Sequence, residues 1–329
     1  MDSNLNKWYE WLAYNIIHDV PHADLQNEMI QEGFSMDQIT SIFESIFQNP
    51  IFGAVRLLKK EKDKGIALSK VLMDLQSLST DFTKVSRESN LSSERFLKDY
   101  YSVNKPVIIT DVVNRWPAFS KWDLDFLSNL LGNELVTYQH RKNPAQHKDS
   151  FIDYSTEILF KEYINLIKKK NCGDIYLIAH DRILDKKSFQ ILFCDMTFDK
   201  RYLDEDNKSG RVFFWLGPKG SKTPMHRDLG NVFFAQIKGR KTVKLIPSLQ
   251  YNLVYNESEY YCEVDFDNIN YDLFPLLKEV KIAEVTINPG ELLFIPVGWW
   301  HEVKSLDITI TITGNNFVFN NVFNPIFTD

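Results

Sequence analysis

Short β-type segments, separated by glycine and proline, follow one another between residues 175 and 319. Turn residues stand at Gly239, Pro247, Pro289-Gly290 and Gly298. The segments are Ile175–Ala179, Val212–Leu216, Val232–Ile237, Thr242–Ile246, Ala283–Ile287, Leu292–Ile295 and Ile308–Phe319. Many short strands with turns between them are typical of an all-β sandwich or barrel. We therefore expect a mainly β domain of the jelly-roll kind.

The first part of the chain has the periodicity of helices instead. Apolar side chains recur there at steps of three and four residues, which is the stripe of an amphipathic helix. The first stripe comprises Leu5, Trp8, Leu12 and Ile16. Pro21 and Gly33 can open and close a second helix. Ser35 and Gln38 match a capping box at the start of a third, and a charged helix over residues 55–76 follows.

These patterns divide the chain into three regions. We expect an N-terminal all-α bundle over residues 1–76, a linker rich in serine, threonine and asparagine over 77–93, and a jelly-roll domain with flanking helices over 94–329. Within the last region, Ile152–Lys170 has a helical pattern. The bundle has two interpretations. It binds a partner or forms a homodimer, or it packs on the barrel and stabilises it.

Charge and cysteine content narrow the class of protein. Lysine and arginine number 38 and aspartate and glutamate 44, so the net charge is −6. An acidic surface disfavours a sequence-independent grip on nucleic acid. The cysteines, Cys172, Cys194 and Cys262, are far apart and odd in number, which argues against a disulfide framework. Without a secretory pattern or a membrane-spanning apolar run, we expect a cytoplasmic protein with no membrane partner.

The tripeptide His226-Arg227-Asp228 can supply two metal ligands. Alternate residues of a strand point to the same face, so the imidazole and the carboxylate emerge side by side. The pattern alone is weak evidence, because His147-Lys148-Asp149 repeats it. That second copy lies in a polar stretch typical of a surface loop. The first copy precedes the strongly apolar segment Val232–Ile237, as a buried site requires.

His301 is the candidate third ligand, because it follows another apolar segment of the same predicted barrel. Two histidines and one carboxylate on one face of an octahedron leave the remaining positions open, as in non-haem Fe(II) oxygenases. The alternative is a pair of core histidines with satisfied hydrogen bonds. Asp228 weakens that alternative, because a buried carboxylate needs partners and a metal is one of the few that fit.

Lys241 alternates with Val243 and Leu245 and therefore shares their face, which we expect to be the core. A lysine that points into a barrel is costly unless it meets an anion, and an acidic cosubstrate would supply one. The alternative is a lysine on an edge strand, where its charge prevents aggregation.

Several longer segments resemble the JmjC-type, cupin-like 2-oxoglutarate oxygenases. They are TPMHRD, VFFAQIKGRK, VDFDN, PGELLFIPVGWWHEV and ITITITGNNF, together with KPVIITDVVNRWPAFSKWDLDFL at residues 105–127. Within that family, the chain is most similar to the asparaginyl hydroxylases that act on hypoxia-inducible factor. The resemblance spans residues 95–319 and implies a double-stranded β-helix.

The resemblance also implies a role for each matching residue. His226, Asp228 and His301 would be the catalytic Fe(II) ligands. The residues that would bind 2-oxoglutarate are Lys241, Thr223, Tyr176 and Asn316, with Asn315 as the alternative to Asn316 if the strand slips by one residue. The implied activity is hydroxylation of a protein or peptide side chain by O2, with release of succinate and CO2 and with ascorbate as a supporting reductant in vitro.

One departure from the family's pattern affects this site. The family usually has asparagine six residues after the first iron-binding histidine, whereas Val232 stands there in this chain and Asn231 precedes it. The hydrogen bonds near the metal are therefore in question. Other readings keep the chemistry but change the substrate to a methylated lysine, a nucleic acid or a small molecule. A further reading is a non-catalytic cupin that serves as a binding or scaffold module.

Overall fold

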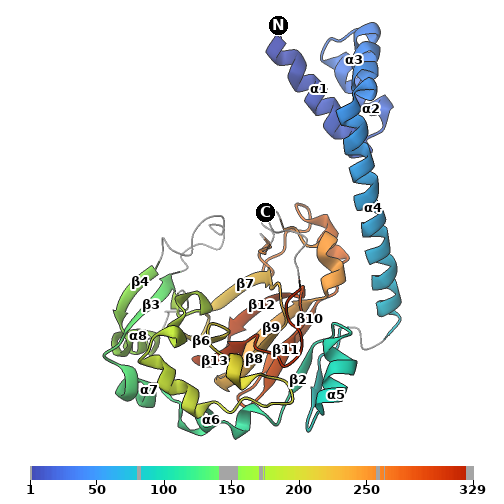
Figure 1. The fold of residues 1–329 in the computed structure, drawn as a ribbon. Helices are drawn as coiled ribbons and strands as arrows, with labels where there is room; N and C mark the ends of the chain where they lie inside the picture. The colour runs from blue at the N-terminus through green and yellow to red at the C-terminus, as the bar shows by residue number, and fades with distance from the viewer. Residues whose placement is uncertain are drawn as a thin grey trace. The chain divides into compact units, whose positions relative to one another are not determined.

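The computed structural model describes residues 2–79, 83–140, 155–169, 173, 175–256, 260–262 and 264–323. Cys172 and the second His-x-Asp tripeptide, at 147–149, lie outside these residues. The chain divides into two compact units, Met1–Gln76 and Ser77–Asp329 (Figure 1). In the described part of the chain, every helix is too short or too polar to span a membrane.

The first unit is helical throughout its described residues. Its helices are α1 (Asp2–Ile17), α2 (His22–Gln31), α3 (Met36–Gln48) and α4 (Pro50–Ser77), the last of which runs one residue past the unit. Apolar side chains of the first three helices, including Leu12, Met29 and Ile39, form one buried cluster. Ser35 caps α3 through the predicted capping box: its Oγ accepts a hydrogen bond from the Gln38 N–H, and Gln38 Oε1 accepts one from the Ser35 N–H.

The second unit is built on β-sheets. The largest sheet has six strands in the order β1-β2-β11-β8-β13-β6, a second has four in the order β10-β9-β12-β7, and a third has the order β4-β3-β5. The strands are β1 (Ser86–Glu88), β2 (Val107–Ile109), β3 (Leu135–His140), β4 (Ser155–Leu159), β5 (Ile175–Tyr176), β6 (Val212–Gly217), β7 (Lys222–Arg227), β8 (Val232–Lys238), β9 (Lys241–Ile246), β10 (Ala283–Ile287), β11 (Leu292–Ile295), β12 (Trp300–Ser305) and β13 (Thr309–Gly314).

Short helices flank these sheets. The α-helices are α5 (Ser93–Phe96), α6 (Pro117–Lys121), α7 (Leu124–Leu131) and α8 (Phe160–Ile167). Asp123 caps α7, where its side chain accepts a hydrogen bond from the Phe126 N–H. A π-helical turn, η1 (Leu97–Tyr101), follows α5. The 3-10 turns are η2 (Val113–Arg115), η4 (Ala179–Asp181), η5 (Ile183–Asp185), η6 (Phe189–Asp195), η7 (Glu205–Asn207), η8 (Ser248–Leu253) and η9 (Pro275–Lys278).

The two larger sheets face each other across an apolar core. Phe234 and Leu293 of the six-stranded sheet share one buried cluster with Val243 and Val303 of the four-stranded sheet. The other face of the six-stranded sheet belongs to a second cluster that also contains side chains of the flanking helices, such as Phe160. This architecture confirms the prediction of a mainly β domain with flanking helices and an N-terminal helical region.

Two segments differ from the expected pattern. The region predicted as a linker, 77–93, contains β1, which pairs in parallel with β2 and so belongs to the six-stranded sheet. The range 152–170 holds the predicted helix as α8, Phe160–Ile167. Strand β4, which precedes it and pairs antiparallel with β3, was not predicted.

Candidate active site

Strands β7 and β12 place His226 and His301 directly opposite each other. The two strands are antiparallel neighbours, and His301 is paired with His226 in their register. Asp228 follows β7 immediately. One ligand atom from each of these three residues lies within 4.8 Å of the others, and His301 Nε2 is 3.6 Å from Asp228 Oδ2. The structure therefore brings together the three residues singled out as metal ligands.

A β-bulge in β7 decides which of its side chains reach this site. The pairing of β7 with β12 shifts register between Thr223 and His226, which leaves Pro224 and Met225 as the bulged residues. In a regular strand, residues three apart point to opposite faces. Here Thr223 and His226 line the same cavity, while Met225 packs on the far side of the sheet with Trp300. The bulge thus adds Thr223 to the face that carries the histidines.

Backbone carbonyls orient both imidazoles. His226 Nδ1 lies 2.8 Å from the Pro224 carbonyl oxygen, and His301 Nδ1 lies 3.1 Å from the Trp299 carbonyl oxygen. Because a carbonyl oxygen only accepts, we assign the proton of each neutral ring to Nδ1. Each Nε2 then keeps its lone pair, which is the form in which histidine binds a metal. This donor set of two imidazoles and one carboxylate fits Fe(II).

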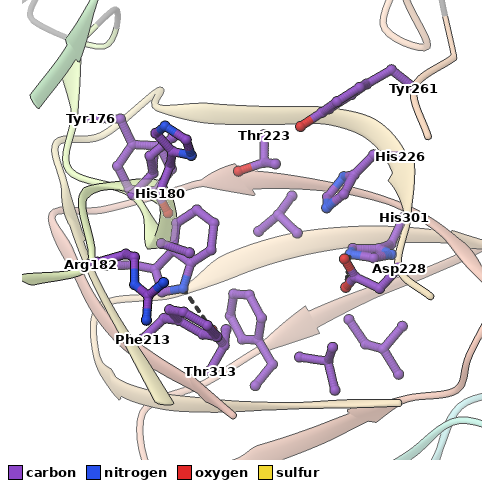
Figure 2. A pocket seen from close by; sticks show the side chains of 17 residues that line it. Tyr176, His180, Arg182, Phe213, Thr223, His226, Asp228, Tyr261, His301 and Thr313 are labelled. Carbon is purple, nitrogen blue, oxygen red and sulfur yellow. Dashed lines mark hydrogen bonds and ion pairs between the residues drawn. The ribbon is translucent and has the colours of Figure 1, made fainter. Parts of the chain in front are cut away.

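The three ligand candidates open into a cavity of about 490 Å³. Figure 2 shows them together on one side of it, and Tyr176, His180 and Arg182 on the other. The lining residues are Tyr176, Ile178, Ala179, His180, Arg182, Phe213, Trp215, Thr223, His226, Asp228, Val232, Phe234, Tyr261, Ile295, His301, Val303 and Thr313. Most of the wall is apolar or aromatic, which suits a site that excludes water.

Lys241 lies behind Tyr176 and is completely buried. Its Nζ donates a hydrogen bond of 2.7 Å to the Tyr176 hydroxyl. Within the described ranges, no carboxylate forms an ion pair with it, and burial lowers the pKa of Lys241 to about 7. Strand β9 lies between β10 and β12, so the alternative of an edge-strand lysine is wrong. Lys241 faces the interior, as its alternation with Val243 and Leu245 predicts.

Asn316 and its alternative Asn315, which the resemblance to the JmjC family assigned to 2-oxoglutarate, are not among the residues that line this cavity. Asn316 is buried, but its Nδ2 donates to the Asp204 carbonyl oxygen at 2.6 Å, and it is not among the lining residues. The cause is that β13 ends at Gly314, after which the chain leaves the sheet. Asn315 does not line the cavity either. Asn231 accepts a hydrogen bond from the Val297 N–H, while Val232 takes the position that faces the cavity.

Sequence reasoning missed several cavity residues, among them His180, Arg182 and Tyr261. The first two follow β5 in 3-10 turns, and Tyr261 forms an isolated bridge with His226. A short irregular segment has no periodicity that would indicate which side it presents. Its place in the sequence could have indicated His180, because it is the last residue of the segment DIYLIAH, which also contains the candidate Tyr176.

A family model described as a cupin-like domain matches residues 93–328. The chain belongs to this family. Its relatives include lysine-specific demethylase JMJ30 of Arabidopsis thaliana, 32% identical over 74% of this chain and 57% of the relative. JmjC domain-containing protein D of Dictyostelium discoideum is 32% identical over 70% of this chain and 55% of the relative. Lysine-specific demethylase 8 of Xenopus tropicalis is 28% identical over 68% and 50%. The chain spans about half the length of these curated relatives, and its similarity to them supports membership of the JmjC oxygenase superfamily.

Proposed function

We propose that this chain is an Fe(II)- and 2-oxoglutarate-dependent oxygenase that hydroxylates a protein or peptide side chain. One observation carries the proposal. Two histidines and an aspartate, which can share one metal ion, line the same cavity as Tyr176. Tyr176 in turn accepts a hydrogen bond from the buried Lys241, which has no carboxylate partner among the described residues. The JmjC relatives support it. The finer resemblance to asparaginyl hydroxylases and the cytoplasmic location stay predictions.

His226, Asp228 and His301 would hold the iron. When bound with 2-oxoglutarate and O2, iron supplies the oxidation of an unactivated C–H bond, with release of succinate and CO2. The protein's contribution is orientation. The carbonyls of Pro224 and Trp299 orient each imidazole through Nδ1, so that Nε2 would be the coordinating atom,.

Lys241, Tyr176 and Thr223 would hold the distal carboxylate of 2-oxoglutarate. Without an anion, the Lys241 ammonium is destabilised by burial, as its lowered pKa shows. A carboxylate beside Nζ restores the charged form, so the cosubstrate binds together with a proton. The apolar side chains Val232 and Phe234 then keep water from the site.

The relatives' names point to a second substrate class. JMJ30 and its counterpart in Xenopus are named lysine-specific demethylases, and JMJ20 of Arabidopsis thaliana is named an arginine-specific demethylase. Demethylation uses the same oxidation on an N-methyl group, so it would need the same ligands and cosubstrate residues. The two classes differ in the charge that enters the cavity.

Succinate formation from 2-oxoglutarate with added Fe(II) and ascorbate tests the proposal without knowledge of the substrate. We expect slow turnover by the native chain and none by His226→Ala or Asp228→Ala. His140→Ala is a matched control, because His140 bonds Thr156 in the third sheet, away from the cavity. Titration with Mn(II) and 2-oxoglutarate accompanies the assay. Native protein that neither turns over nor binds either component would contradict the proposal and support a scaffold role.

A further inference from the structure

Arg182 occupies an unusual backbone position at the cavity. It stands between η4 and η5 with φ +46°, in the left-handed region that residues other than glycine rarely adopt. Its N–H donates to the Ala179 carbonyl oxygen, and its own carbonyl accepts from the Asp185 N–H, each at 3.0 Å. Two turns therefore fix this residue from both sides. Strain of this kind persists where function requires a side chain at one place.

The guanidinium of Arg182 is anchored at one nitrogen only. Nε donates a hydrogen bond to Asp185 Oδ2 at 2.5 Å. Nη2 lies next to Gly210, so close that a Cβ atom at residue 210 would be 3.1 Å from it. Neither Nη group has a hydrogen-bond partner among the residues that the structure describes. Figure 2 shows Arg182 with Tyr176 and His180 across the cavity from the metal-ligand candidates. Paired Nη groups are the donors that bind a carboxylate in bidentate fashion.

Apart from the histidines and tyrosines, Arg182 and Asp228 are the ionisable acid and base side chains among the described lining residues. Asp228 is the single carboxylate among the described lining residues, and the proposed function assigns it to the metal. Asp181 is close in sequence, but its oxygens accept from Gln139 Nε2 at 3.1 Å and from the Ile178 N–H at 2.8 Å. Asp185 pairs with Arg182 through Nε but does not line the cavity. A cationic side chain would therefore meet the Nη groups of Arg182 with no unassigned carboxylate among the described lining residues, which is a repulsive arrangement.

We propose that the substrate presents a carboxylate to this cavity, as an aspartyl or glutamyl side chain of a peptide does, and that Arg182 selects it. The inference rests on the proposed function and specifies its substrate class. It separates this chain from a methyl-lysine or methyl-arginine demethylase. The aromatic side chains of the cavity, which could otherwise surround a methylammonium group, would flank the acidic side chain.

Peptide pools with randomised flanks and a central aspartate, glutamate, asparagine or trimethyl-lysine test this inference. The readouts are stimulation of succinate formation over the basal rate and a mass gain of one oxygen on the peptide. We expect the acidic pools to stimulate the native chain most. Arg182→Glu should reverse the preference for aspartate over trimethyl-lysine. Arg182→Gly should abolish that preference while it relieves the backbone strain, which guards against a misfolded variant.

Arg240→Gln is the matched control, because Arg240 also binds an aspartate through Nε, at 2.9 Å from Asp307, but lies outside the cavity. It should keep the native preference. Stimulation by the trimethyl-lysine pool alone, stimulation by no pool, or an unchanged preference in both Arg182 variants would overturn the inference. Iron-dependent basal succinate formation in the same samples would still support the proposed function, so the two failures are distinguishable.

Discussion

The two faces of the four-stranded sheet differ in whether their lysine side chains have carboxylate partners among the described residues. On the inner face, Lys241 has no carboxylate in an ion pair within the described residues, and burial lowers its pKa to about 7. On the outer face of the same strand, Lys244 forms ion pairs with Asp267 at 2.9 Å and Glu302 at 3.3 Å. Burial works to lower the pKa of Lys244, but the hydrogen bond to Asp267 and the charge of Glu302 outweigh it and raise the pKa.

The outer charges form a closed network. Asp267 accepts ion pairs from Lys222, Lys244 and Lys304, and Glu302 accepts from the first two of these lysines. These contacts tie the loop that carries Asp267 to the sheet. The paired charges of the outer face hold a loop to the sheet, whereas the buried charge of Lys241 is the one that the proposed function assigns to a ligand.

Lys241→Met should have the largest effect of these variants on the KM for 2-oxoglutarate, and it should distinguish the role of the inner face from that of the outer face. Loss of a buried charge-assisted hydrogen bond costs about 3 kcal/mol of binding, so we expect the KM for 2-oxoglutarate to rise roughly 100-fold. The free energy of unfolding should rise at neutral pH, because methionine removes the desolvation cost. Lys244→Met should do the opposite: weaker folding in urea titrations with little change in KM. An unchanged KM in Lys241→Met would remove this lysine from the cosubstrate site.

Glu302→Gln tests the outer network at its most buried member. Glu302 is only 3% exposed and lies between Lys222 and Lys244. Removal of one partner from a buried ion-pair network leaves Lys222 and Lys244 with less counter-charge, so we expect a loss of about 2 kcal/mol in the free energy of unfolding. Urea denaturation measures it. Unfolding at the native urea midpoint would show that the network does not stabilise the fold.

The pH dependence of cosubstrate binding should report the inner lysine. Above pH 7 the free protein loses the Lys241 proton, while the bound carboxylate favours the ammonium. The affinity for 2-oxoglutarate should therefore fall as pH rises, by up to about tenfold per pH unit, with uptake of a proton on binding. Titration calorimetry in buffers of different ionisation enthalpy measures that uptake. Lys241→Arg should lose this dependence, because arginine stays charged.

The lowered pKa of Lys241 also makes the free energy of unfolding depend on pH, and this free energy should rise with pH where the affinity for 2-oxoglutarate falls. The folded-state pKa of Lys241, about 7, lies below the ordinary lysine value of 10.5, so between these values the unfolded chain binds more protons than the folded one. The contribution of Lys241 to the free energy of unfolding should therefore rise with pH across this window. Chemical denaturation of the native chain and Lys241→Met at pH 7 and pH 9 should show the gap between them narrowing at the higher pH.

Lys304→Ala should have the smallest effect. Its side chain is 46% exposed and makes one ion pair, to Asp267. Exposed pairs contribute about 0.5 kcal/mol or less, so the thermal unfolding midpoint should hardly move, and high salt should erase the difference from the native chain. A loss as large as that of Glu302→Gln would show that the network acts as one unit.

The sequence predicts which residues lie on the inner face of the four-stranded sheet better than it predicts where the backbone departs from a regular strand. Strict alternation is enough to place Lys241 beside Val243 and Leu245, and apolar segments around His226 and His301 indicate that both lie on barrel strands. Alternation also predicts that Thr223 and His226 diverge. The bulge that brings them together depends on pairing with β12, which no local pattern specifies,.

Most other differences have the same physical origin. Strand β4 forms by pairing with β3, a partner that its own short sequence does not indicate. Asn316 falls at the expected sequence position, but the chain has already left β13 and the side chain turns to Asp204. Arg182 owes its place to two consecutive turns. Contacts distant in the sequence decide the first two outcomes, whereas local turns without periodicity decide the third.

The bulge in β7 gives this strand two independent halves. Thr223, before it, and His226, after it, line the same cavity. The proposed function assigns the first to the cosubstrate and the second to the metal. A single residue inserted or deleted between them would shift one half against β12 while the other half kept its register. Pro224-Met225 is therefore an adjustable spacer, through which an evolving or engineered relative could change the distance between Thr223 and the metal-ligand candidates without rebuilding the barrel.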